Sequence, residues 1–177
     1  ELIKHVEPLL YKYQVNFAFW GHNHAVQRMS AVYQKKVIQR STSIDDGYGG
    51  TIHTYNNPQA TVHCVMGTGG AKLDYNAIVP YPEWNEEVFT RWGYARVQSI
   101  NDTTLDIQWV DSGDGLVYDH IVITRDVSDE KWHHNNDKDS GREALGSSIQ
   151  LVIVILGVVV IVVVAVGGIM YRRSCKV

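Results

Sequence analysis

A short apolar segment that ends at a pair of histidines constrains this chain more than any other feature. Residues Val15 to Trp20 are rich in Val, Phe and Trp, and Gly21 follows them. Such residues fit a buried, pleated surface and the glycine ends the run, so we predict a β-strand here. His22 and His24 come next, two residues apart, and on extended backbone their imidazoles would point to the same side. This spacing is typical of metal ligands, which often lie at strand ends in α/β proteins.

Two histidines at this spacing are often ordinary surface or core residues, so the surrounding sequence decides between the two interpretations. The last metal motif of purple acid phosphatases, G-H-x-H-A-Y-E-R, resembles the block Gly21-His22-Asn23-His24-Ala25-Val26-Gln27-Arg28. Further blocks follow in the family's order at Tyr55-Asn56-Asn57, Val62-His63, Gly67-Thr68-Gly69-Gly70 and Trp92-Gly93-Tyr94-Ala95-Arg96. The resemblance covers about residues 1–125 and favours the metal interpretation.

The resemblance implies both a fold and a chemistry for residues 1–125. The family's fold is an α/β, four-layer metallophosphoesterase sandwich, in which two mixed sheets pack face to face with helices outside. We expect this chain to be its C-terminal half, a mixed sheet that ends in an antiparallel meander. By resemblance, His22 binds a divalent zinc, iron or manganese ion, His24 binds Fe(III), and a metal-bound hydroxide attacks a phosphate monoester. Imidazoles suit these metals, and paired ions can activate water and neutralise the leaving oxygen.

Two positions of the motif depart from the family's pattern. Val26 stands where the family usually has Tyr, and Gln27 where it usually has Glu. Both lie beside the expected ligands, where neighbouring side chains orient imidazoles and tune the metal. Arg28 is the remaining charged residue of the motif. We expect it to hold the loop by pairing with a carboxylate or a carbonyl group, and contact with the phosphate is the alternative.

The family's other catalytic residues belong to earlier motifs, which this sequence does not contain. We therefore expect the chain to be part of a longer acid phosphatase whose catalytic residues lie upstream. A catalytically inactive, membrane-anchored receptor or binding module is one alternative, and a phosphodiesterase of the same superfamily is another. The net charge of -3 gives no basic surface, so we expect no nucleic acid partner.

Patterns along residues 1–125 predict the elements around the motif. Apolar residues at helical spacing indicate a helix at 1–14, in which Pro8 marks a kink or the first turn. Residues 29–60 are polar and rich in turn formers, so we expect loops with one strand near 31–38. Asp45 and Asp46 lie there and are expected in a turn rather than at a metal. Apolar runs, or alternating apolar and polar residues, predict further strands at 61–66, 93–100, 104–111 and 117–124. We expect the last three to form an antiparallel meander.

The end of the chain has a different composition. Residues 126–148 are polar and carry too little apolar surface to fold alone, so we expect a juxtamembrane linker. Residues 149–170 are almost uniformly apolar and, at about 1.5 Å per residue, long enough to cross a bilayer as a transmembrane helix. Residues 171–177 carry the basic charges, which places them in the cytoplasm.

These features together predict a single-pass type I membrane protein with an extracellular or lumenal phosphatase domain. Asn101 begins an N-x-T sequon on an expected hairpin tip, which predicts a glycan there. Cys175 lies just inside the membrane and is a candidate for palmitoylation, with an unmodified thiol as the alternative. A cleaved lipid-anchor signal is another explanation of the apolar segment, but Arg172 and Arg173 argue against it.

Overall fold

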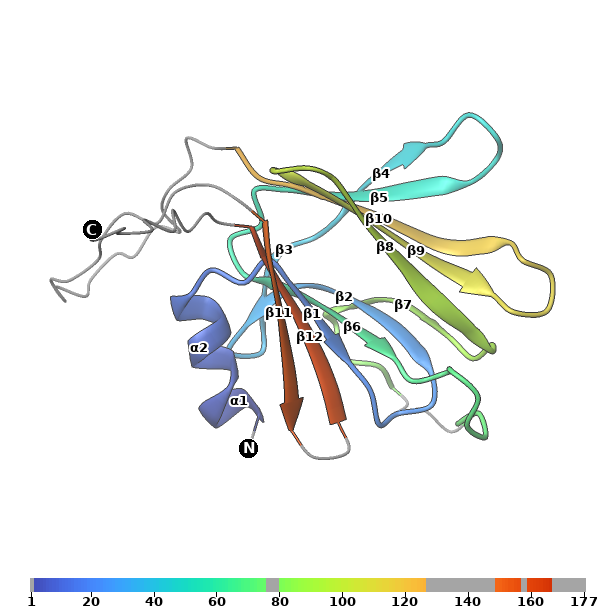
Figure 1. The fold of residues 1–177 in the computed structure, drawn as a ribbon, viewed down its shortest axis with the longest axis horizontal. Coiled ribbons are helices and arrows are strands. Elements are labelled where there is room, and N and C mark those ends of the chain that lie inside the picture. Colours follow the sequence, from blue (N-terminus) through green and yellow to red (C-terminus); the bar gives the residue numbers. More distant parts are fainter. Residues whose placement is uncertain (1, 76–79, 127–148, 157–158, 167–177) are drawn as a thin grey trace, which may run out of the picture.

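A computed structural model describes residues 2–75, 80–126, 149–156 and 159–166, and two β-sheets dominate this part of the chain (Figure 1). Sheet A has the strand order β11 (Ile149–Leu156), β12 (Val159–Val166), β1 (Phe17–Trp20), β6 (Thr61–Met66), β2 (Val26–Tyr33) and β3 (Lys36–Gln39), and β7 (Asn85–Phe89) also pairs with β2. Sheet B has the order β4 (Thr42–Asp45), β5 (Thr51–Asn56), β10 (Val117–Thr124), β9 (Thr104–Asp111) and β8 (Gly93–Asn101). Both sheets are mixed, because β1 runs parallel to β6 and β5 runs parallel to β10.

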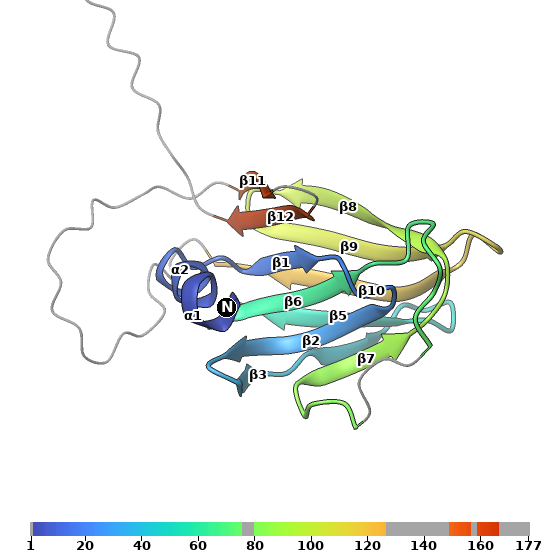
Figure 2. The ribbon, with the colours of Figure 1, turned by 90° about the horizontal axis from the view of Figure 1, so that it is seen from below.

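The hydrophobic core lies between the two sheets, with sheet B above sheet A in Figure 1 and the strands of the two sheets overlapping when seen from below in Figure 2. Phe17 and Val62 from sheet A meet Ile107 and Ile121 from sheet B in one buried cluster. Burying a side chain of this size contributes about 1.5–3 kcal/mol relative to leaving it exposed. The expectation of mixed sheets packed face to face is confirmed.

Two short helices lie on the face of sheet A that turns away from sheet B. They are α1 (Leu2–His5) and α2 (Glu7–Lys12), and Pro8 lies in the first turn of α2. A helix start does not need the missing proline N–H, so Pro8 begins a helix here. Leu10 of α2 packs against Val15 and Ala18. The predicted helix at 1–14 is confirmed as two pieces.

Strands β1, β6, β8, β9 and β10 lie where the sequence predicts them, but the expectation of loops at residues 29–60 is wrong. Most of β2 and all of β3, β4 and β5 lie in this range. Gln34 and Lys35 have φ angles of 51° and 63° and make the tight turn between β2 and β3. β4 is exposed along its whole length, so it has no hydrophobic pattern that could indicate it.

The two aspartates of this region act as turn formers, as expected. The amide of Gly47 donates to Asp45 Oδ1 at 2.6 Å, and that of Gly50 donates to Asp46 Oδ1 at 2.8 Å. Aspartate side chains commonly close turns in this way. The pair therefore shapes the β4–β5 connection.

The apolar segment at residues 149–170 differs from the predicted transmembrane helix. Its described residues form β11 and β12, which pair with each other, and β12 extends sheet A by pairing with β1. An apolar run cannot be assigned to helix or strand by periodicity alone, and the β-branched Val and Ile that dominate this one favour strands. Within the described ranges, no helix is both long and apolar enough to cross a membrane.

The other predictions for the end of the chain fall outside the described residues. These are nearly all of the linker, at 127–148, and the tail at 171–177 with Cys175. Residues 157–158 and 167–170 of the apolar segment also lie outside.

Candidate metal centre

The loop that carries the two histidines connects β1 to β2. His22 is exposed and has a φ angle of 73°, in the left-handed region that most residues avoid. Histidine adopts this conformation more often than most residues, and such backbone strain is concentrated at functional sites. Side chains two residues apart point to the same side only where the backbone is extended, and the backbone at His22 is not extended. The expectation that His22 and His24 point to the same side therefore has no support from the backbone here. The loop is shaped by other contacts.

The loop that follows β6 holds the histidine loop. The amide of Gly67 donates to the carbonyl of Ala25 at 3.2 Å, and the amide of Asp74 donates to the carbonyl of His24 at 3.0 Å. Nδ1 of His24 lies 2.7 Å from the carbonyl oxygen of Lys72. A carbonyl only accepts, so Nδ1 carries the hydrogen and Nε2 keeps the lone pair that a metal ion needs. Metal-binding histidines are commonly oriented by a contact of this kind.

The two loops approach each other closely at Gly67. A Cβ atom on it would lie 1.7 Å from the carbonyl oxygen of Asn23. We expect Gly67→Ala to push the loops apart and to lower the metal affinity of the intact protein about 10-fold or more, as changes around ligands do. Gly69→Ala is the matched control, because nothing lies within 4 Å of a Cβ there. Equal metal affinities for the two variants in a chelator competition would contradict this account.

The metal-donor atoms around the loop are of the type that an iron or zinc centre needs, but there are too few of them. Imidazole suits both metals, whereas structural and catalytic zinc sites take four or more donors. No cluster of three or more His, Cys, Asp or Glu side chains that could hold a metal occurs in the described part of the chain. Asn23 Oδ1 and Thr68 Oγ1 are buried beside the loop without a hydrogen-bond partner. Buried polar atoms are rarely unpaired, so these two oxygens near the histidines still lack a hydrogen-bond partner. His22 and His24 can supply two ligands of a centre that needs further donors.

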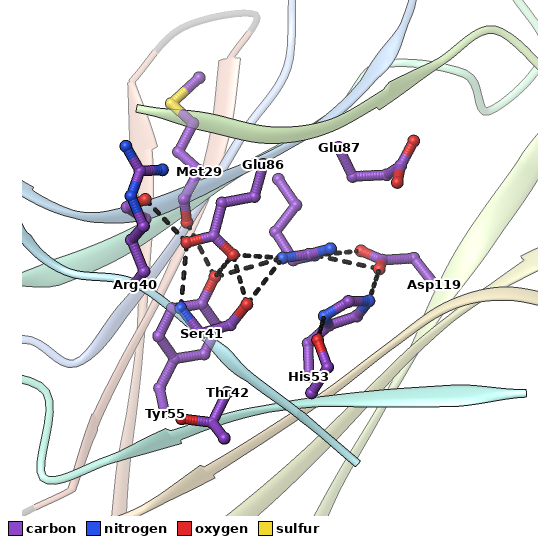
Figure 3. A network of polar contacts seen from close by, with 12 residues as sticks. Met29, Arg40, Ser41, Thr42, His53, Tyr55, Glu86, Glu87 and Asp119 are labelled. Atoms are coloured by element: carbon purple, nitrogen blue, oxygen red, sulfur yellow. Dashed lines mark hydrogen bonds and ion pairs between the residues drawn. The ribbon is translucent and has the colours of Figure 1, made fainter. Parts of the chain in front are cut away.

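Arg28 lies four residues beyond His24, in β2 of sheet A, and its side chain reaches Asp119 of sheet B. Figure 3 shows Glu86 and Asp119 on either side of this polar network. Only 1% of it is exposed. Its Nε lies 3.0 Å from both carboxylate oxygens of Asp119 in β10, and its Nη1 donates to Glu86 Oε2 in β7 at 2.6 Å. Tyr55 Oη lies 3.0 Å from the same Glu86 oxygen. Arg28 is therefore buried between two carboxylates and is not exposed to a phosphate.

The charges of this cluster are set by burial and by the contacts within it. Burial opposes the charge on Arg28, but Asp119 and then Tyr55 hold the pKa of the guanidinium above its usual value. Burial likewise acts to raise the pKa of Glu86, but hydrogen bonds from Ser41 and Ser30 outweigh it and lower that pKa. Arg28, which is buried, and Glu86, which is half-buried, therefore form an ionised pair.

Sequence reasoning identified Arg28 but not its partners. Asp119 carried a usable signal, because it shares the core-facing side of β10 with Ile121 and Ile123. A carboxylate at such a position needs a buried partner. Glu86 and the Lys72 carbonyl carried no such signal, since β7 shows no clear alternation and every residue has a carbonyl.

His63 in β6 is a half-buried histidine outside the metal loop. Trp20 Nε1 donates to its Nδ1 at 2.9 Å, and burial lowers the pKa of His63 to about 4 from 6.5. The unfolded chain then binds this proton more readily, so stability is complete above about pH 6.5 and falls as the pH drops toward 4. We expect His63 to account for about 2–3 kcal/mol of this loss.

Urea denaturation at several pH values tests this expectation. Comparing the protein with its His63→Gln variant separates His63 from the other groups that titrate in acid. The variant should lose less stability between pH 6.5 and 4. Parallel pH profiles would show that His63 is not responsible.

Comparison with known proteins gives this site its context. Residues 60–120 match the family described as iron/zinc purple acid phosphatase-like protein C. Residues 60–120 are thus similar to the C-terminal domain of purple acid phosphatases. The relatives of this chain include the acid phosphatase type 7 of Danio rerio, 32% identical over 68% of this chain and 26% of that protein. That of Homo sapiens is 31% identical over the same shares.

A solved structure has a similar fold over part of this chain. Purple acid phosphatase PPD1 from yellow lupin (Lupinus luteus) aligns with a TM-score of 0.56 and 29% identity, over 68% of this chain and 19% of that one. The chain spans about a quarter of the length of the curated relatives named above. The match therefore covers only part of each of these relatives.

The two departures from the family motif are buried in sheet A. Val26 and Gln27 lie in β2, between β6 and β7, and are 1% and 7% exposed. They are thus packed into sheet A beside the histidine loop.

Proposed function

We propose that the protein is a metal-dependent acid phosphatase that hydrolyses phosphate monoesters at acidic pH. The observation that carries this proposal is the contact between His24 Nδ1 and the Lys72 carbonyl, which leaves Nε2 with its lone pair. The relatives named acid phosphatase type 7 support the same reaction.

The chain's own part in the reaction is to bind and position. His22 and His24 would bind a dinuclear centre of Fe(III) with zinc, iron or manganese, together with donors from elsewhere in the protein. Such a centre activates water and neutralises charge on the leaving oxygen. The loop after β6 orients His24 through its backbone. Arg28 supports β2, at whose start the histidine loop ends, from the side of sheet B.

Two other functions have specific support. Val26 and Gln27 depart from the motif, and one relative, 28% identical, is named probable inactive purple acid phosphatase 24 of Arabidopsis thaliana. This favours an inactive, phosphatase-like receptor or binding module. A relative from Hordeum vulgare, also 28% identical, is named nucleotide pyrophosphatase/phosphodiesterase, which favours diester hydrolysis.

Hydrolysis assays on the intact protein distinguish the three functions. We expect 4-nitrophenyl phosphate to be hydrolysed much faster than bis(4-nitrophenyl) phosphate, and the activity to require the bound metals. Faster hydrolysis of the diester would favour a phosphodiesterase. Absence of turnover on both esters by a protein that retains its metals would favour the binding module.

We also propose that the protein is a type I membrane protein whose phosphatase domain faces outward. The support is the apolar composition of residues 149–170 and the basic residues after them. Asn101 is exposed at the end of β8, where a glycan can be attached. The pairing of β12 with β1 is a different arrangement of this segment, so the test has to separate the two.

Extraction and protease protection provide that test. If the segment crosses the membrane, the protein should resist alkaline carbonate extraction. Protease added to intact cells should degrade the domain and spare a C-terminal tag, and Asn101→Gln should remove a mass that deglycosylation also removes. Release by carbonate would instead favour strands that stay in sheet A, and a protected domain with a lost tag would mean inverted topology.

A further inference from the structure

A shallow polar hollow of about 490 Å³ lies on strands β8 and β9 of sheet B. In β9 the side chains of Leu105 and Ile107 are buried in the core, so the alternate residues point away from sheet A. The volume lies within the range of sites that hold a small ligand. The hollow is lined by Arg96, Val97, Gln98, Asp106 and Gln108.

The hydrogen bonds around the hollow leave the amide group of Gln108 available. Asp106 Oδ2 lies 2.7 Å from Nε2 of His120. A carboxylate only accepts, so this ring nitrogen carries the hydrogen. Gln108 Nε2 lies 3.4 Å from the same nitrogen and has no acceptor there, while Gln108 Oε1 accepts from Arg96 Nη2. The amide hydrogens of Gln108 are therefore free to donate to a ligand.

The walls of the hollow suit an uncharged ligand that both donates and accepts hydrogen bonds. Gln98 is exposed, and its amide has no hydrogen-bond partner in the described part of the chain. Arg96 and Asp106 contribute opposite charges, so an anion would meet the carboxylate and a cation would meet the guanidinium. Hydroxyl groups donate to a carboxylate or an amide oxygen and accept from an amide or a guanidinium. A sugar carries several such groups and no charge.

Asn101, which begins the sequon, lies on the same face of the sheet as the hollow. Gln98 is opposite Asp106 and Asn101 is opposite Thr104, and these two residues of β9 point to the same side. The register of β8 shifts between Ser99 and Asn101. This bulge brings Asn101 to the side of Gln98, although the two residues are three apart in the sequence.

The side chain of Asn101 is held with its amide nitrogen free. Its Oδ1 accepts from the amide of Thr103 at 2.9 Å and from the Thr103 hydroxyl at 3.0 Å. These contacts leave Nδ2, the atom that carries an N-linked glycan, without a partner among the described residues. Gln98 lies about 10 Å away along the strand, so sugars beyond the first one can reach the hollow.

We propose that this hollow binds the chain's own N-linked glycan, which is attached at Asn101 and lies back along the outer face of β8 and β9. The amides of Gln98 and Gln108 donate to sugar hydroxyl groups, and Asp106 accepts from them. The inference rests on the outward placement proposed above, because the glycan is added in a secretory lumen, and it does not depend on the phosphatase activity.

Cleavage of the glycan by endoglycosidase H tests this contact on the folded, intact protein, made in cells that add high-mannose glycans. The enzyme cuts between the first two sugars, so a glycan that lies on the sheet has to lift off first. Gln98→Ala should speed cleavage at Asn101 by about 3- to 10-fold, the effect of losing about one hydrogen bond. Mass spectrometry of the peptide that contains Asn101 measures the rate.

Gln39→Ala is the matched control, because Gln39 lies in β3 of sheet A and its Nε2 donates to the carbonyl of Asn56 at 3.0 Å. This variant should be cleaved at the rate of the unaltered protein. Equal rates for the unaltered protein and Gln98→Ala would overturn the inference and leave the outward placement standing. Equal acceleration in both variants would also overturn it, since general loosening of the domain would then be the cause. Absence of a glycan at Asn101 would overturn the inference and remove the sequon's support for the outward placement.

Discussion

His24→Ala and His22→Ala are each expected to lower the metal content of the intact protein to less than half and to reduce monoester hydrolysis by more than about 100-fold. Each change removes a donor that no other described His, Cys, Asp or Glu cluster can replace. Metal content is measured by inductively coupled plasma mass spectrometry, and turnover with 4-nitrophenyl phosphate.

His120→Ala is the matched control for the loss of an imidazole. His120 is paired with Asp106 at 2.7 Å in sheet B and is not part of the histidine loop. We expect this variant to keep its metals and its activity. If His24→Ala also kept both, the assignment of the metal centre to this loop would be wrong.

Arg28→Met is expected to lower the free energy of unfolding by about 3–5 kcal/mol, the cost of leaving a buried charge without its partner. The side chain is 1% exposed and contacts carboxylates from both sheets, so the change leaves the buried Asp119 and the half-buried Glu86 without their guanidinium. Urea denaturation of the intact protein measures the loss.

Two further variants show whether the loss comes from unpaired charge. Adding Asp119→Leu to Arg28→Met should recover part of the stability, because one of the stranded carboxylates is then gone. Arg96→Met is the control, since Arg96 pairs with Gln108 on the exposed part of sheet B and should change stability by less than about 0.5 kcal/mol. A loss below about 1 kcal/mol for Arg28→Met would contradict a structural role for the buried pair.

The predictable strands are those whose burial leaves a local pattern. β9 alternates buried and half-buried residues, and its partners β8 and β10 are joined to it by short turns, so the meander is visible in the sequence. β5 lies in the sheet because it pairs with β10, which is distant in the chain. Such a partner leaves no mark on the local composition. The apolar segment at 149–166 shows the opposite problem, because uniform apolarity fits a membrane helix and a buried strand equally well.

In the candidate site, too, the residues with a local sequence signal could be predicted and the groups contributed from distant parts of the chain could not. His22 and His24 could be predicted because their spacing and surrounding motif are local in the sequence. The group that orients His24 could not, because it is the main-chain carbonyl of Lys72, 48 residues away. The expectation that His22 lies on extended backbone failed for a related reason: the loop bends where the chain after β6 packs onto it, through Gly67.

Anomalous X-ray diffraction from crystals of the intact protein, recorded at the iron and zinc absorption edges, tests the central claim most directly. Our account predicts a metal peak about 2.1 Å from Nε2 of His24, with Nδ1 still in contact with the Lys72 carbonyl, and a second peak within coordination distance of His22. A protein that hydrolyses phosphate monoesters while its metal peaks lie away from both imidazoles would contradict it.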